Sequence, residues 1–158
     1  MDEGRGGLLP GAGGMTFLVC EDGSEYTDRF KRFLGAQFRF LRAGHFAEAL
    51  ALAAGADALL LDLDFRRTPR ELLVDERGAP DKRGATEVQG ILILRALRSR
   101  GVALPAVLFA DLDDAAHATR LERELAPLKI VPGRAGLPRI AQLLRELVSS
   151  ATGKVEKS

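Results

Sequence analysis

The sequence is poor in the residues that build disulfide frameworks and zinc sites, with one cysteine, Cys20, and two histidines among 158 residues. These residues do not have the spacing of zinc ligands, and a single cysteine forms no internal disulfide. A dominant charge is also missing, because 23 Lys and Arg stand against 22 Asp and Glu, a net charge of +1. Such a chain has no basic field to attract DNA or RNA. We therefore expect a cytoplasmic protein that does not bind nucleic acid.

Long apolar runs are absent too. The segment 56–61 is interrupted by Asp57 and is far shorter than the roughly 20 residues of a membrane span, so we expect no membrane segment. Hydrophobic residues still make up 46% of the chain, which is typical of a globular domain with one core. Glycines near the start favour a flexible leader over 1–14, followed by a domain over 15–150 and a flexible tail over 151–158.

From Thr16 onward, short apolar segments alternate with segments of helical periodicity. The expected strands lie at 16–20, 38–41, 58–61, 106–110 and 129–131. Strict alternation predicts a parallel sheet with helices on both faces, joined by right-handed crossovers. The fold class is therefore α/β, a flavodoxin-like (βα)5 doubly wound parallel sheet with strand order 2-1-3-4-5.

Carboxylates follow the first and third expected strands, as Glu21, Asp22 and Asp62. In the predicted order these strands are neighbours at the switch point, where ligands bind beyond the carboxyl ends of the strands. Clustered carboxylates repel one another, and a hard divalent cation such as Mg²⁺ relieves the repulsion. The alternative is that these acids face solvent or cap helices. Both interpretations stay open from the residues alone.

Four segments in their order resemble the receiver domain of two-component response regulators. They are FLVCED at 17–22, ALLLDL at 58–63, GILILRALR at 90–98 and PAVLF at 105–109. The resemblance spans residues 15 to 148. It implies that Glu21 and Asp22 help to hold Mg²⁺ and that Asp62 accepts a phosphoryl group from a histidine kinase.

The sequence departs from this family at the residues that handle the phosphoryl group. Ala110 stands where receivers have Ser or Thr, and Val131 stands where they have Lys. In-line phosphoryl transfer depends on such fixed donors, so their loss predicts inefficient transfer. Lys129 and Arg134 are the candidates to replace the missing cation, although Asp111 adds negative charge at the same place.

A long polar segment separates Asp62 from Gly90, and we interpret about 65–89 as an insertion in the domain. The segment mixes charges of both signs with Pro and Gly, and 72–74 is its one apolar anchor. Long loops in compact domains are usually functional or disordered. Two hypotheses remain: a disordered or neutral insertion, and a loop that covers the site or binds a partner.

The leading functional hypothesis is a stand-alone pseudo-receiver, a non-enzymatic signalling module that acts through protein contacts. A histidine kinase or a second copy of the chain is the expected partner. The alternative is a working phosphoreceiver with Asp62 as acceptor. A third hypothesis rests on Glu21 with Asp62 and Asp64, because this pattern is similar to the acidic residues of Toprim metal-dependent nucleic-acid enzymes.

Overall fold

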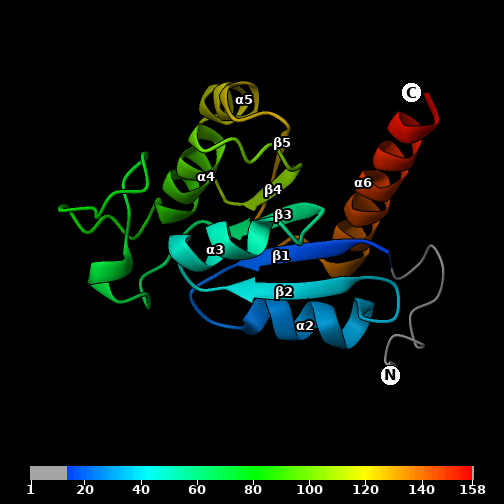
Figure 1. Ribbon diagram of the computed structural model, residues 1–158, viewed down its shortest axis with the longest axis horizontal. Helices are drawn as coiled ribbons and strands as arrows, with labels where there is room; N and C mark the ends of the chain where they lie inside the picture. The colour runs from blue at the N-terminus through cyan, green and yellow to red at the C-terminus, as the bar shows by residue number, and fades with distance from the viewer. Residues whose placement is uncertain (1–13, 158) are drawn as a thin grey trace.

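The computed structural model describes residues 14–157, with side chains described as far as residue 150. One five-stranded sheet has the order β2-β1-β3-β4-β5, and every neighbouring pair is parallel (Figure 1). The predicted fold class and strand order are confirmed. The strands are β1 (Thr16–Cys20), β2 (Arg39–Ala43), β3 (Ala58–Asp62), β4 (Ala106–Phe109) and β5 (Leu128–Val131). The predicted leader, apart from Gly14, lies outside the described residues.

Helices cover both faces of this sheet. They are α2 (Glu25–Leu34), α3 (Phe46–Ala53), α4 (Gln89–Ser99), α5 (Ala115–Glu124) and α6 (Leu137–Lys157). α2 and α6 pack against one face, whereas α3, α4 and α5 pack against the other. The predicted domain end at residue 150 falls inside α6, which continues to Lys157. Within residues 14–157, no helix combines the length and the apolar character that a membrane span requires.

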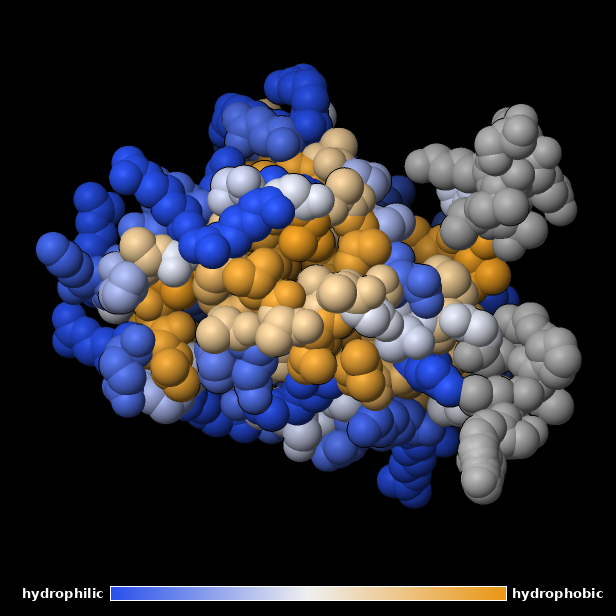
Figure 2. Space-filling model, in the orientation of Figure 1, coloured by the Kyte–Doolittle hydropathy of each residue, from blue (hydrophilic) through white to orange (hydrophobic). Residues whose placement is uncertain are grey.

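The three inner strands, β1, β3 and β4, are buried on both sides because both faces of the sheet are covered. In β1, Leu18 and Cys20 point into the core beneath α3, α4 and α5, whereas Phe17 and Val19 point toward α2 and α6. In Figure 2, hydrophilic side chains cover the projecting insertion and α5, and the apolar surface lies over the centre of the molecule, around α3. Two continuous cores therefore hold the strand ends in fixed register.

The segment 65–89 is a folded part of the domain, not a disordered insertion. Phe65 is fully buried, and Leu73 and Val74 from the predicted apolar anchor are buried with it. The segment contains a short 3-10 helix, η1 (Arg70–Leu72). The buried side chain of Gln89 accepts from the Val74 N–H at 2.8 Å and donates to the Val74 carbonyl at 3.1 Å. These contacts fix the path of the insertion as it leaves β3 and returns to α4.

Candidate functional site

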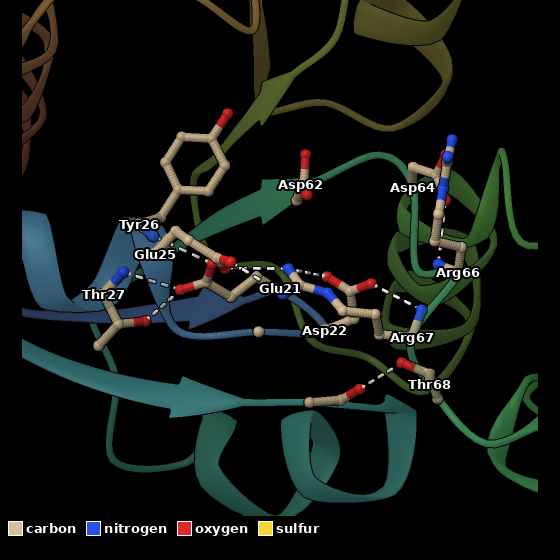
Figure 3. Close-up of polar contacts among 12 residues, drawn as sticks. Glu21, Asp22, Glu25, Tyr26, Thr27, Asp62, Asp64, Arg66, Arg67 and Thr68 are labelled. Carbon is tan, nitrogen blue, oxygen red and sulfur yellow. Dashed lines mark hydrogen bonds and ion pairs between the residues drawn. The ribbon is translucent and has the colours of Figure 1, made fainter.

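The acidic residues named from the sequence lie at one edge of the sheet, where β1 and β3 end side by side (Figure 3). Cys20 pairs with Leu61 in the parallel register, so Glu21 and Asp62 follow at the same level. This shared location is the one that the strand order predicts. The side chains nevertheless have different partners.

Glu21 stabilises the start of α2. Its side chain is buried, at 2% exposure for the residue, and both carboxylate oxygens accept hydrogen bonds. Oε1 accepts from the Tyr26 N–H at 3.1 Å, and Oε2 accepts from the Thr27 N–H at 2.7 Å and the Thr27 hydroxyl at 2.6 Å. A carboxylate at this place satisfies free N–H groups of the first turn and complements the helix dipole. Ser24, at the N-cap position of α2, makes no capping bond and instead donates to Asp28 Oδ2 at 2.9 Å.

Asp22 is paired with an arginine from the insertion. The Arg67 backbone N–H donates to Asp22 Oδ2 at 2.8 Å, and Arg67 Nη2 donates to Oδ1 at 3.2 Å. The same guanidinium binds both carboxylate oxygens of Glu25, at 2.8 and 2.9 Å. Hydrogen bonds from Arg67 lower the pKa of Glu25 to about 2, and those from Glu25 and Asp22 raise the pKa of Arg67. One guanidinium thus bridges the end of β1 and the first turn of α2.

Asp62 has no such partner. Its Oδ1 accepts only the N–H of the next residue, Leu63, at 2.9 Å, and no described Lys or Arg forms a salt bridge with it. Burial raises the pKa of Asp62 to about 6 against the lowering effect of that hydrogen bond, and the nearby carboxylates of Asp22 and Glu21 add to the rise. The ionised form of Asp62 is therefore disfavoured.

Asp64 is satisfied locally by Arg66. Its Oδ1 accepts the Arg66 N–H at 3.0 Å, and its Oδ2 accepts from the Arg66 guanidinium at 2.6 Å. Hydrogen bonding to Arg66 lowers the pKa of Asp64. The two neighbouring arginines of the insertion therefore bind different acids, Arg66 the acid next to it in sequence and Arg67 the distant Asp22.

The residues at the ends of β4 and β5 have no side-chain hydroxyl or ammonium group to bind a phosphoryl group. Ala110 and Val131 are buried, and the Ala110 N–H donates to the Val131 carbonyl at 2.9 Å. Lys129 is exposed on β5 opposite Val107, and Arg134 is exposed in the following loop. Neither forms a hydrogen bond or salt bridge with Asp62 within the described part of the chain. Lys129 and Arg134, the two residues considered as replacements for the missing cation, therefore do not bind Asp62.

Tyr26 and Arg67 are the site residues that the sequence did not identify. The Tyr26 ring stacks on Phe109 at a centroid distance of 5.1 Å, and its hydroxyl donates to the Gly133 carbonyl at 3.0 Å. Burial, and then the charge of Asp62, raise the pKa of Tyr26 to about 12. Tyr26 looks like an ordinary core residue in a helical pattern. The one sequence feature that points to Arg67 is its position at the start of the insertion, shortly after Asp62.

These contacts do not leave a set of ligands suited to Mg²⁺. Among the described residues, no group of three or more His, Cys, Asp or Glu side chains is placed to hold a metal ion. Both oxygens of Glu21 bind α2, and both oxygens of Asp22 bind Arg67. Mg²⁺ demands near-ideal octahedral oxygen geometry. The predicted ligands share an edge of the sheet but do not converge on one point.

Comparison with known proteins gives matches to solved structures alone: no family model and no curated protein matches the chain. The receiver domain of a Francisella response regulator is 15% identical, with a TM-score of 0.64 over 87% of this chain and 98% of that domain. A CheY-like receiver domain protein from Methanospirillum hungatei is 12% identical, with a TM-score of 0.61 over 89% and 98%.

A third solved structure is the BeF3-activated N-terminal receiver domain of RstA from Klebsiella pneumoniae. It is 18% identical, with a TM-score of 0.59 over 84% of this chain and 97% of that domain. Identities this low establish the fold and no more. The chain therefore has the fold of the response-regulator receiver domain, which its sequence segments resemble.

Proposed function

We propose that this chain is a pseudo-receiver, a signalling module that acts through protein contacts without efficient phosphorylation. The observation that carries the proposal is the environment of Asp62. The neighbouring strand ends present the apolar Ala110 and Val131, and the nearby charged groups are carboxylates. The chain is a binding module in this proposal and not an enzyme.

Physical chemistry explains why this environment opposes transfer. An in-line phosphoryl transfer needs the equatorial oxygens of the phosphoryl group to be neutralised by a metal and by fixed donors. Removing one such donor typically costs about 3 kcal/mol of transition-state stabilisation. Here the hydroxyl and the lysine of the receiver pattern are both replaced, and Arg67, a cation at the same edge, is bound to Asp22 and Glu25.

The other two hypotheses find less support at this edge. A phosphoreceiver would need a cation near Asp62, and the candidates Lys129 and Arg134 are exposed without a bond to it. A Toprim-like enzyme would need Glu21 as a free metal ligand, and both of its oxygens bind α2. The proposed partners are proteins, either a histidine kinase or a second copy of the chain, in the cytoplasm.

The test is incubation of the purified chain with acetyl phosphate and Mg²⁺, followed by intact mass measurement. We expect no increase by the mass of a phosphoryl group in the wild type or in Asp62→Asn. A phosphorylated wild type together with an unmodified Asp62→Asn variant would establish Asp62 as a working acceptor and contradict the proposal. Light scattering over a range of protein concentrations would separately identify a second copy as the partner.

A further inference from the structure

We propose that Arg67 takes the place of the divalent cation at this acidic edge, so that the insertion itself excludes Mg²⁺ from the site. The inference rests on the proposed function in treating this edge as the receiver site. The carboxylates of Glu21 and Asp22 suit a metal ion by type, but their hydrogen bonds do not leave them free.

The Arg67 guanidinium lies between two carboxylates and binds both. It donates to Asp22 through Nη2 and to Glu25 through Nη1 and Nη2 (Figure 3). The Asp22 side chain is only 5% exposed, whereas that of Arg67 is 56% exposed. The planar fork of an arginine suits this double contact better than a point charge does. Arg67 thus forms the outer cover of the nearly buried Asp22 carboxylate.

Contacts of the insertion on both sides of Arg67 hold this residue in place. On one side Phe65 is fully buried and its N–H donates to the Thr86 carbonyl at 3.0 Å. On the other side the Thr68 hydroxyl donates to the Gly44 carbonyl at 3.0 Å. The backbone is ordered by these contacts, so the arginine loses little further freedom on binding the acids.

Gly23 provides the room for this arrangement. A Cβ atom built on Gly23 would overlap the Arg67 guanidinium and the Glu25 carboxylate. The turn after β1 is further held by Arg42, which donates to the carbonyls of Gly23 and Asp22. The local sequence after β1 therefore accommodates an arginine side chain across the acidic pair.

Removal of the guanidinium alone should free one oxygen of Asp22 while the backbone contact that orients its carboxylate stays. The Arg67 backbone N–H, which binds Asp22 Oδ2, is present whatever the side chain at position 67. Without the guanidinium, Asp22 Oδ1 would lose its ion pair, next to Asp62, whose pKa the Asp22 charge already raises. A hard cation with oxygen preference is the ligand that relieves such repulsion.

The experiment is a Mg²⁺ titration of the full chain by calorimetry, with thermal unfolding as a second measure, since binding to the folded state raises Tm. We expect R67Q to bind Mg²⁺ at least about tenfold more tightly than the wild type, because a positive charge beside the carboxylates is gone. R66Q is the matched control and should behave as the wild type, because Arg66 pairs with Asp64. The double variant D22N/R67Q should lose the gain.

Equal Mg²⁺ affinity of the wild type and R67Q would overturn the inference, whether both bind or neither does. A measurement on the wild type keeps the test independent of how well R67Q folds. The NMR signals of the Arg67 guanidinium N–H groups should not change when Mg²⁺ is added. Loss of these signals to rapid exchange with water would show that the metal displaces the guanidinium, and would contradict the inference. Phosphorylation of wild-type Asp62 would contradict the proposed function and not the role of Arg67. Failure of the proposed function and failure of this inference are therefore distinguishable.

Discussion

Glu21, Asp22 and Asp62 lie at one edge of the sheet, yet each carboxylate meets a different environment. Glu21 is bound by N–H groups of α2, Asp22 by a guanidinium, and Asp62 by a single N–H. Glu21 and Asp22 thus have several hydrogen-bond donors, whereas burial raises the pKa of Asp62. Carboxylates at one edge therefore affect the stability of the fold differently.

Asp62→Asn should stabilise the protein near neutral pH. The pKa of Asp62 rises from 3.8 to about 6, so the folded state binds more protons than the unfolded state between these values, and ionised Asp62 costs stability above them. After allowance for solvent screening, the variant should gain about 1 to 2 kcal/mol. Urea unfolding at several pH values measures it. The gain should vanish below pH 3.8, and a gain that is constant with pH would contradict this origin.

Glu21→Ala should destabilise the fold by about 1 to 3 kcal/mol, because it removes the acceptor of the Tyr26 and Thr27 N–H groups and of the Thr27 hydroxyl. Ser24→Ala is the matched control, since the Ser24 hydroxyl makes no capping bond to α2. Chemical denaturation compares the two variants. A larger loss for Ser24→Ala than for Glu21→Ala would mean that the cap lies elsewhere.

At the scale of elements, the insertion is a small folded unit attached between β3 and α4. Gln89, the first residue of α4, is only 1% exposed, and its side chain forms hydrogen bonds with the N–H and the carbonyl of Val74. Gly90 follows, where a Cβ would overlap the Asp62 carbonyl. The start of α4 therefore joins the insertion to the end of β3 within two residues.

Gln89→Ala should loosen the insertion by leaving the Val74 N–H and carbonyl without partners in a buried place. The expected cost is about 1 to 3 kcal/mol. Hydrogen exchange should increase in 65–89 more than in the strands. Glu87→Ala, at an exposed neighbouring position, should change stability by about 0.5 kcal/mol or less. Uniform loss of protection over the whole domain would argue against a local unit.

At the scale of the whole molecule, Arg98 on α4 joins segments that are distant in sequence. Its guanidinium donates to four backbone carbonyls, which are those of Val102, Leu104, Leu125 and Pro127. These carbonyls belong to the connection before β4 and to the connection between α5 and β5. A single side chain thus ties the entrances of both strands to α4.

Arg98→Met should cost about 2 to 3 kcal/mol, because bonds from a charged donor to half-buried carbonyls are lost. Arg95→Met on the same helix is the matched control. Arg95 forms one exposed pair with Glu124, and its loss should cost at most about 1 kcal/mol. Thermal unfolding compares them, and equal losses for both variants would mean that Arg98 contributes no more than a surface charge.

The sequence was sufficient for the sheet and insufficient for the site. Apolar runs such as 17–20, alternating with segments of helical periodicity, predict the sheet and its strand order, because buried parallel strands have a strong local pattern. The contact between Asp22 and Arg67 depends on the path of the insertion, which no periodicity encodes. The role of Glu21 as a cap also depends on how the turn folds back on α2. Partners of this kind are tertiary, so local patterns do not reveal them.

The edge strand β5 is protected against the addition of another strand. β5 is an edge strand, yet the Ile130 N–H donates to Glu122 Oε2 at 2.9 Å, and Lys129 beside it is exposed. A backbone donor satisfied in this way, next to a charged side chain, opposes the addition of another strand and hence aggregation. Lys129, first considered for phosphoryl chemistry, protects an edge.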